Sequence, residues 1–264
     1  MATAALCGGF IFQREKQMTI AILSALPEEQ AGWVEGLHGL RATRHAGRQF
    51  WQGRWQGQGV EHELVCALSG IGKVAAATTA AALIERFGAT RIVFTGVAGG
   101  VGPGVRVGDV VVASEYLQHD FDASPLFPRW ELPGYGRARL ACDPGMSAAL
   151  HAASRDCVGS PLRAHHGLVA SGDQFVGTAQ ASQALRHRLE AAGHAVLAVE
   201  MEGAAVAQTC HDYGVPFAAM RTISDGADDS AAVDFTEFVR DVASRYAQQI
   251  LGGFLQRLAP LPRT

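Results

Sequence analysis

Four carboxylates stand at or just after the ends of apolar segments, and they are the groups in this chain best suited to acid–base chemistry. They are Glu29, Glu200, Glu202 and Asp225. Burying an unpaired charge costs several kcal/mol of folding free energy. A carboxylate at the end of a buried strand is therefore expected either to have a partner or to serve a function. Ligands of open α/β sheets also bind beyond the carboxyl ends of the strands. The four acids therefore favour acid–base chemistry on a neutral or cationic group, and they argue against a phosphate-rich ligand.

Each of these acids also has a purely structural explanation. Glu29 follows a proline, which is typical of the first turn of a helix. Asp225 precedes a glycine and fits a helix cap or a turn. Glu202 fits the first turn of the next helix, where the helix dipole favours an anion. On an extended backbone Glu200 and Glu202 would point to the same side, and one helix dipole explains only one of them well.

Two glycine-rich stretches also follow strand-like segments, SGIGK at 69–73 and TGVAGGVGPG at 95–104. The first lacks the spacing and the Ser or Thr of a P-loop, and the second lacks the G-x-G-x-x-G spacing of a dinucleotide site. Two explanations remain open for both stretches. The glycines either allow tight turns with positive φ, or they let backbone N–H groups approach a ligand closely.

Strand-like and helix-like segments alternate along the chain and would position these motifs. We expect strands near 19–25, 91–96, 108–117, 166–170, 195–200 and 215–223, a hairpin over 48–57 and 61–68, and helices over 72–87, 144–156, 179–191, 203–212 and 234–256. A long irregular loop with three prolines spans 118–143. This pattern predicts a single-domain α/β fold with three α/β/α layers and a central mixed twisted sheet.

Composition excludes several classes of protein. The chain has 264 residues, 48% of them hydrophobic and 18% charged, which is typical of a globular protein. A net charge of −3 with scattered basic residues gives no reason to expect nucleic acid or an anionic membrane as partner. A membrane-spanning helix needs about 18 consecutive apolar residues, and no apolar run in the sequence approaches that length. Five widely spaced cysteines without a C-x-x-C pair predict reduced thiols, a cytoplasmic location and no metal site.

The first 17 residues read poorly as a signal peptide, because their basic residues follow the apolar part. A second methionine, Met18, directly precedes the first strand-like run. We therefore expect residues 1–17 to be a dispensable extension and 18–264 to form the functional domain. A protein that starts at Met18 should keep its activity.

The motifs SALPEE, SGIGKVAAA, TGVAGG, VGDVVVA, SGDQFV, VEMEGAAVAQ and RTISDGAD occur in this order between residues 18 and 255. This ordered set resembles the nucleoside phosphorylase/nucleosidase superfamily, and most closely the bacterial 5′-methylthioadenosine/S-adenosylhomocysteine nucleosidases. The resemblance implies a nucleoside phosphorylase-like fold and hydrolysis of the N-glycosidic bond of these two nucleosides, and of 5′-deoxyadenosine, in methionine salvage and methyl-cycle recycling. It implies no cofactor, and a homodimer whose partner contributes to the pocket.

The resemblance also implies roles for three of the acids. Glu29 matches the glutamate that activates the attacking water, and Asp225 matches the acid that protonates N7 of adenine. Glu202 matches the carboxylate that binds the ribose hydroxyls. These roles fit the reaction, because protonation turns adenine into a neutral leaving group while positive charge develops on the sugar.

Further matches concern binding of the nucleoside. Phe175 matches the aromatic residue stacked on the purine, the backbone of Val176 matches the group that reads the adenine edge, and Met201 matches the residue packed on the sugar. The remaining matches are a ligand-contacting glycine, the serine directly before the acid, and two residues that support the water and the ribose: Gly99, Ser224, Arg221 and Glu200.

The chain departs from the family pattern at several positions. Leu26 and Pro27 stand where many relatives have methionine and an acid, Val97 stands where serine is common near the water, and Gly203 replaces a frequent alanine. The loop 118–134 is longer and richer in proline than in many relatives, and it corresponds to a region that closes the neighbouring subunit's pocket. Preference among 5′ substituents is therefore not determined by the resemblance.

Alternative functions remain open at this point. Phosphorylases of the family carry phosphate-binding arginines, one of them soon after the first strand, where this chain has Pro27, Glu28 and Glu29. A carboxylate beside the attacking oxygen repels phosphate and suits water, so hydrolysis is favoured. Another nucleosidase, such as futalosine hydrolase, shares the scaffold and the MEG stretch at 201–203. A non-catalytic nucleoside-binding module would be expected to lack Glu29 or Asp225.

Overall fold

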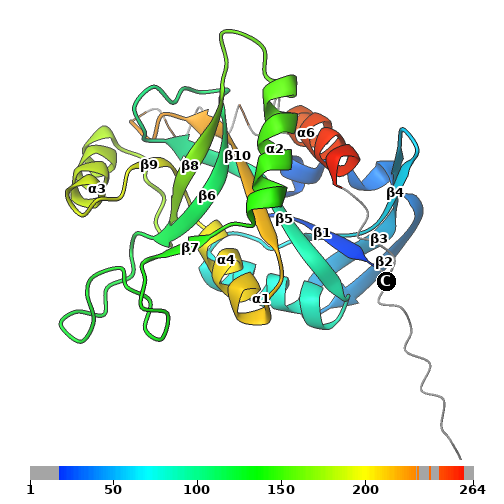
Figure 1. Cartoon of the computed structure of the whole chain (residues 1–264), viewed down its shortest axis with the longest axis horizontal. Coiled ribbons are helices and arrows are strands. Elements are labelled where there is room, and N and C mark those ends of the chain that lie inside the picture. Colours follow the sequence, from blue (N-terminus) through cyan, green and yellow to red (C-terminus); the bar gives the residue numbers. More distant parts are fainter. Residues whose placement is uncertain (1–17, 230, 232–237, 239–243, 259–264) are drawn as a thin grey trace, which may run out of the picture.

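The computed structural model describes residues 18–229, 231, 238 and 244–258 (Figure 1). Its strands are β1 (Thr19–Ser24), β2 (His38–His45), β3 (Arg48–Gly57), β4 (Val60–Leu68), β5 (Ala89–Gly100), β6 (Val110–Gln118), β7 (Arg139–Ala141), β8 (Ala164–Ser171), β9 (Val196–Glu200) and β10 (Phe217–Asp225). Its α-helices are α1 (Lys73–Glu85), α2 (Pro144–Cys157), α3 (Ala179–Ala191), α4 (Gly203–Tyr213) and α6 (Ser244–Arg257). Two short 3-10 helices cover Pro27–Gln30 and Val34–Gly36.

All strands belong to one mixed sheet, and part of this sheet closes on itself. The strand order is β10-β6-β8-β9-β5-β1-β4-β3-β2, with β7 on β6. Because β5 also pairs with β10, the pairings β10–β6–β8–β9–β5 return to β10 and form a ring. Most of the pairs in the ring are parallel, but β9 runs antiparallel to β5 and β10 antiparallel to β6. The carboxyl ends of β5, β9 and β10 therefore meet.

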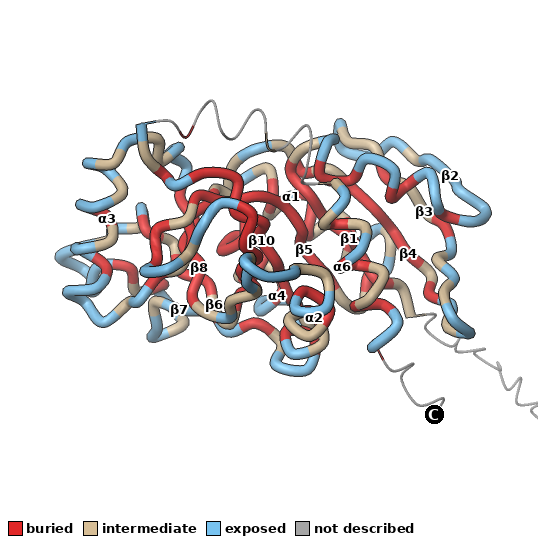
Figure 2. Tube along the Cα trace, turned by 90° about the horizontal axis from the view of Figure 1, so that it is seen from above, coloured by how far each residue is buried: buried red, intermediate tan, exposed pale blue. Residues whose placement is uncertain are grey.

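Helices cover both faces of the sheet, as the predicted three-layer fold requires. Along β1, Ala21 and Leu23 belong to the core cluster shared with α1 and α4, whereas Ile20 and Ile22 belong to the cluster shared with α2 and α6. Figure 1 shows these two helix pairs on opposite sides of the strands. Burial on both faces explains why the strands appear in the sequence as continuous apolar runs. Figure 2 shows buried residues along the central strands and exposed residues on the loops and on β2.

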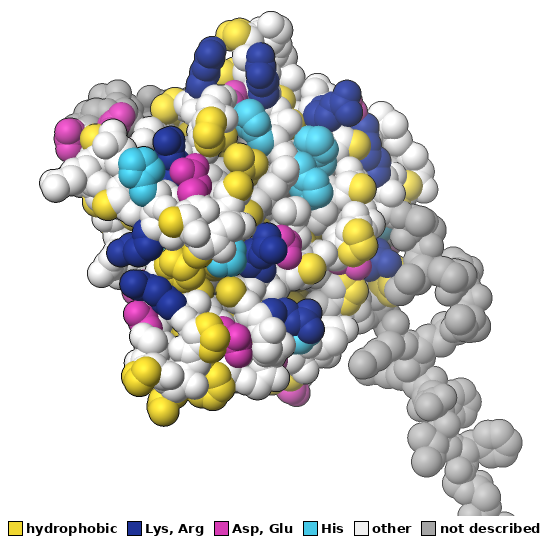
Figure 3. Space-filling model, turned by 60° about the vertical axis from the view of Figure 1, so that its left-hand side comes forward, with side chains coloured by type: hydrophobic (Ala, Val, Ile, Leu, Met, Phe, Trp, Pro, Cys, Tyr) yellow, Lys and Arg dark blue, Asp and Glu magenta, His cyan; other side chains and the backbone are white. Residues whose placement is uncertain are grey.

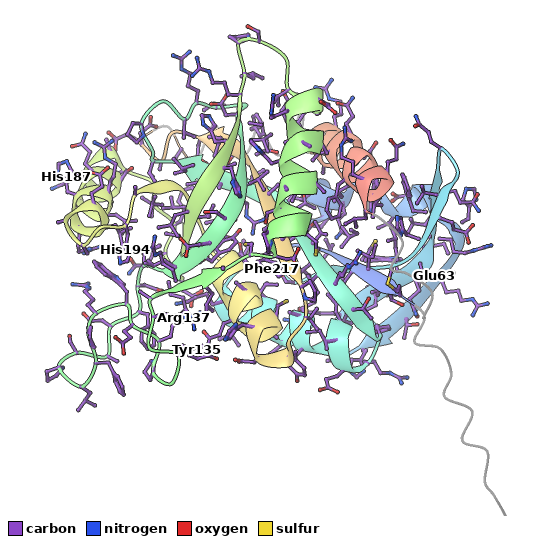
Figure 4. All side chains as sticks on the ribbon, in the orientation of Figure 1. Glu63, Tyr135, Arg137, His187, His194 and Phe217 are labelled. Carbon is purple, nitrogen blue, oxygen red and sulfur yellow. The ribbon has the colours of Figure 1, made fainter. Side chains whose placement is uncertain are left out.

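The main differences from the predicted elements concern β2 and the loop 118–143. The sequence pattern missed β2, because its residues are almost all exposed and carry no apolar alternation. The predicted loop at 118–143 contains the short strand β7 and is anchored on α4, where Asp212 accepts a hydrogen bond from the hydroxyl of Tyr135 (labelled in Figure 4). The last predicted helix is present from Ser244 to Arg257, whereas its beginning and residues 1–17 lie outside the described residues.

Within the described residues, no helix has the length and apolar character needed to cross a membrane. The four cysteines found there, Cys66, Cys142, Cys157 and Cys210, are free thiols. On the face shown in Figure 3, basic side chains are interspersed with acidic side chains and histidines. This face therefore carries no block of a single charge sign.

Candidate active site

A cavity of about 320 Å³ lies where the carboxyl ends of β5, β9 and β10 meet. Nine of the ten site residues predicted from the sequence line it: Glu29, Gly99, Phe175, Val176, Glu200, Met201, Glu202, Ser224 and Asp225. The tenth, Arg221, lies behind the cavity wall and is 1% exposed. The structure thus brings motifs from distant parts of the chain to one place.

Several other residues of this wall were not predicted as site residues. Ala25, Leu26, Ile71, Val97, Ala98, Gln174 and Val199 also line the cavity. Most of them are apolar neighbours of the recognised motifs, so their types alone carried no chemical signal. Leu26 and Val97 are departures from the family pattern, and here they make an apolar wall beside Glu29.

Strand pairing explains how the acids come together. Gly99 on β5 pairs with Val199 on β9 and with Asp225 on β10. A Cβ atom on Gly99 would lie 2.9 Å from Asp225 Oδ1, and one on Gly96 would lie 2.9 Å from Glu29 Oε1. Close approach of carboxylates therefore explains both glycines. The alternative explanation, a turn with positive φ, applies within 95–104 only to Gly104.

Glu29 lies at the end of the first 3-10 helix with its carboxylate turned into the protein. Its Oε2 accepts hydrogen bonds from the backbone N–H groups of Ala25 (2.8 Å) and Leu26 (3.0 Å), and its Oε1 accepts one from Val97 (3.1 Å). The side chain caps its own helix, so the structural explanation is partly right. Burial raises the pKa of Glu29 above its ordinary value, although the three N–H groups oppose this shift. A buried carboxyl group held in one orientation suits a general base.

Asp225 ends β10 and is almost completely buried. Its Oδ2 accepts a hydrogen bond from Ser224 Oγ (2.8 Å), and its Oδ1 accepts one from the N–H of Ala227 (2.9 Å). The second bond is the local turn that the structural explanation anticipated. Both bonds fix the carboxyl group where it lines the cavity.

Glu200 and Glu202 have different partners, and this corrects the simple helix-start explanation. Glu202 stands at the N-cap of α4, but its side chain does not cap that helix. The N-terminal N–H groups of α4 instead reach Glu200, which accepts bonds from Glu202 N (3.1 Å) and Gly203 N (2.8 Å). The helix dipole therefore acts on Glu200, while Glu202 is left to face the cavity and accepts a bond from Gly72 N (2.8 Å).

Arg221 supplies the counter-charge for Glu200. Its Nη2 lies 2.7 Å from Glu200 Oε2, and its guanidinium group stacks over the ring of Phe94 at 4.0 Å. Ser171 Oγ also donates to Glu200. Burial raises the pKa of Glu202, and the negative charge of Glu200 raises it further. Glu200 is thus a supporting carboxylate that is paired with Arg221. Among the described residues, no basic side chain forms an ion pair with Glu202.

Another departure from the family pattern has a steric cause. A Cβ atom on Gly203 would lie 2.3 Å from Cε1 of Tyr116, whose ring is fully buried against the start of α4. An alanine at this position would require Tyr116 to move. The glycine therefore accommodates the large side chain on β6.

We expect Glu202→Gln to lower activity and to stabilise the fold. At pH 7 burial opposes ionisation of Glu202 in the folded protein, whereas the same carboxyl group ionises freely in the unfolded chain. This difference lowers the free energy of unfolding of the wild-type protein, and a neutral amide removes it. The Oε1 atom of glutamine can still accept the Gly72 N–H. Thermal unfolding should show Tm about 2–4 °C higher than wild type at pH 7.

The pH dependence of the Tm difference between Glu202→Gln and wild type tests this explanation. Protonation removes the cost in the wild-type protein, so the difference in Tm should shrink as the pH falls toward 4.5, the ordinary pKa of the group. A lower Tm for Glu202→Gln at pH 7 would contradict the raised pKa of Glu202.

Comparison with known proteins identifies the family of this chain. The sequence profile of the phosphorylase superfamily matches residues 19–256. The chain belongs to the phosphorylase superfamily. A curated member of this superfamily, the 5′-methylthioadenosine/S-adenosylhomocysteine nucleosidase of Shewanella piezotolerans, is 35% identical over 227 residues, which cover 84% of this chain and 92% of the relative.

Solved structures from this superfamily have the same fold. The 5′-methylthioadenosine/S-adenosylhomocysteine nucleosidase of Neisseria meningitidis, in complex with methylthio-immucillin-A, is 34% identical with a TM-score of 0.82, covering 91% of this chain and 99% of that one. The futalosine hydrolase of Helicobacter pylori is 30% identical with a TM-score of 0.81, covering 91% and 98%. The superfamily thus accounts for the fold, and the substrate must be argued from the site.

Proposed function

We propose that this chain is an N-glycosyl hydrolase that cleaves 5′-methylthioadenosine and S-adenosylhomocysteine into adenine and the 5′-substituted ribose. One observation carries the proposal. Four carboxylates, Glu29, Glu200, Glu202 and Asp225, line the cavity, and none of the described residues that line it is Lys, Arg or His. Such a site suits a neutral nucleoside on which positive charge develops, and the curated relative described above acts on nucleosides of this kind.

Each acid then has one task. Asp225, held by Ser224, protonates N7 so that adenine leaves as a neutral base. Glu202 accepts hydrogen bonds from the ribose hydroxyls, and in its ionised form its negative charge stabilises the positive charge that develops on the ring. Glu29 takes a proton from the attacking water. Glu200 and Arg221 support Glu202 from behind by fixing the start of α4.

The remaining matched residues bind the substrate. Phe175, which is 52% exposed at the cavity rim, stacks on the purine, and the backbone of Val176 reads the adenine edge. Met201 packs on the sugar, and Gly99 lets the ligand approach the end of β5. The apolar wall of Leu26 and Val97 suits a thioether at the 5′ position.

Water, and not phosphate, is the nucleophile in this proposal. A phosphate ion beside Glu29 would meet a carboxylate at short range, and the described lining offers no cation to offset the repulsion. The test is product analysis with 5′-methylthioadenosine, S-adenosylhomocysteine, 5′-deoxyadenosine and futalosine, each with and without phosphate. We expect adenine and a free 5′-substituted ribose at the same rate in both conditions. Formation of a sugar 1-phosphate would overturn the hydrolase, and faster turnover of futalosine would reassign its substrate.

We further propose that the enzyme is a homodimer that works in the cytoplasm, in methionine salvage and methyl-cycle recycling. Apolar side chains exposed around the cavity and on the loop after β6 support a dimer: Ile71, Val74, Leu126, Phe127 and Phe175. Sedimentation velocity should give the mass of two chains. A monomer with full activity would contradict a pocket that the partner completes.

A further inference from the structure

The SGIGK segment holds protein carboxylates with its backbone. Gly70 and Gly72 have positive φ, so the turn explanation applies to this segment. The N–H groups that follow the turn are not left for a ligand. Gly72 N donates to Glu202 (2.8 Å), and Lys73 N donates to Asp173 Oδ1 (2.8 Å). The start of α1 therefore joins the carboxylate proposed for the ribose to the segment that carries Phe175 and Val176.

The side chain of Lys73 extends this connection to the end of β6. Its Nζ lies 2.5 Å from Asp120 Oδ1 and 3.1 Å from Gln118 Oε1. Asp120 Oδ2 in turn accepts the backbone N–H of Asp173 (2.9 Å). The ion pair is largely shielded, with Lys73 16% and Asp120 21% exposed, so its charges are screened less than those of a surface pair. We call Lys73, Gln118, Asp120 and Asp173 the Lys73 cluster.

The segment held by the cluster has little support of its own. Residues 172–178 form neither helix nor strand. Gly172 packs directly on the ring of His119, since a Cβ there would lie 2.3 Å from Cε1 of that ring. The backbone that follows carries Gln174, Phe175 and Val176 into the cavity. The first residue of the segment is bonded to the end of β9, where Gly172 N donates to Glu200 O (3.1 Å). Beyond that bond, the Lys73 cluster holds the segment through Asp173.

We propose that Lys73 and Asp120 are positioning residues for recognition of the purine. Neither side chain lines the cavity; they act by fixing Asp173 and, through it, Phe175 and Val176. This inference rests on the proposed function, because it takes the base to bind against Phe175 and Val176. It adds that the Lys73–Asp120 ion pair holds the base side of the site against the start of α1, where the N–H of Gly72 binds the carboxylate on the ribose side.

The test compares ligands that fill different halves of the site. Calorimetry measures binding of adenine and of 5-methylthioribose to wild type, Lys73→Met, Asp120→Asn and the double variant. We expect each single variant to weaken adenine binding about tenfold, as loss of one charge-assisted contact does, and to leave 5-methylthioribose within about twofold. The double variant should bind adenine no more weakly than either single variant, because the two residues act as a pair.

Glu61→Gln is the matched control, because it breaks the exposed Arg54–Glu61 pair on the β3–β4 hairpin and should change neither affinity. Thermal unfolding of every variant checks the fold, and the near-isosteric Asp120→Asn decides the outcome if Lys73→Met does not fold. Adenine affinity within twofold of wild type in Asp120→Asn overturns the inference, and so does an equal loss for both ligands. Wild-type turnover of 5′-methylthioadenosine, measured alongside, tests the proposed function separately.

Discussion

Asp225→Asn is expected to reduce adenine release from 5′-methylthioadenosine by about 10²–10⁴-fold in kcat while the protein stays folded. An amide has no proton that it can give to N7, so adenine would have to leave as an anion. The amide oxygen can still accept the bond from Ala227 N, which keeps the turn after β10. Coupled detection of adenine gives the rate, and thermal unfolding checks the fold.

A second substrate separates acid catalysis by Asp225 from simple binding. A 5-methylthioriboside of p-nitrophenol has a leaving group that needs no protonation, so Asp225→Asn should cleave it nearly as fast as wild type. Asp156→Asn is the matched control, because this aspartate lies on the exposed side of α2 and pairs with Arg257. Equal losses of rate on both substrates would reject the assignment of Asp225 as the acid.

Glu29→Gln is expected to cost about 10²–10⁴-fold in kcat, because an amide cannot take the proton of the attacking water. In the wild-type protein both oxygens of Glu29 accept bonds from backbone N–H groups. In the variant one of these oxygens is replaced by an NH2 group, which cannot accept such a bond, so some loss of stability is expected as well. Binding of adenine should change little, since adenine does not need the water. Glu35→Gln, at an exposed glutamate in the next 3-10 helix, is the matched control.

The pH dependence of kcat/KM tests the assignment of Glu29 as the general base. A general base works only when ionised, and burial raises the pKa of Glu29, so kcat/KM should begin to fall on the acidic side well above pH 4.5. Glu202 has a raised pKa too, and the acidic limb therefore belongs to the two groups together. An acidic limb centred below pH 4.5 would contradict the buried base.

Prediction from the sequence worked where local patterns carry the information. Runs such as 19–25 and 215–223 are apolar because both faces of their strands are buried, and the structure places β1 and β10 there. It failed for β2, since an edge strand that faces solvent has no apolar pattern to detect. The closed ring of strands also escaped, because the pairing of β5 with β10 joins segments more than a hundred residues apart.

The sequence by itself determined which residues stand at the strand ends, and its resemblance to a known family placed Glu29, Phe175, Glu202 and Asp225 in one motif set. Only the tertiary structure decided what each of them contacts. It assigned the N–H groups of α4 to Glu200 and gave Glu202 the N–H of Gly72, 130 residues away. It also joined Lys73 to Asp120 and Asp173. The physical reason is that hydrophobic periodicity encodes which face of an element is buried, whereas the partner of a polar side chain depends on strand order and register.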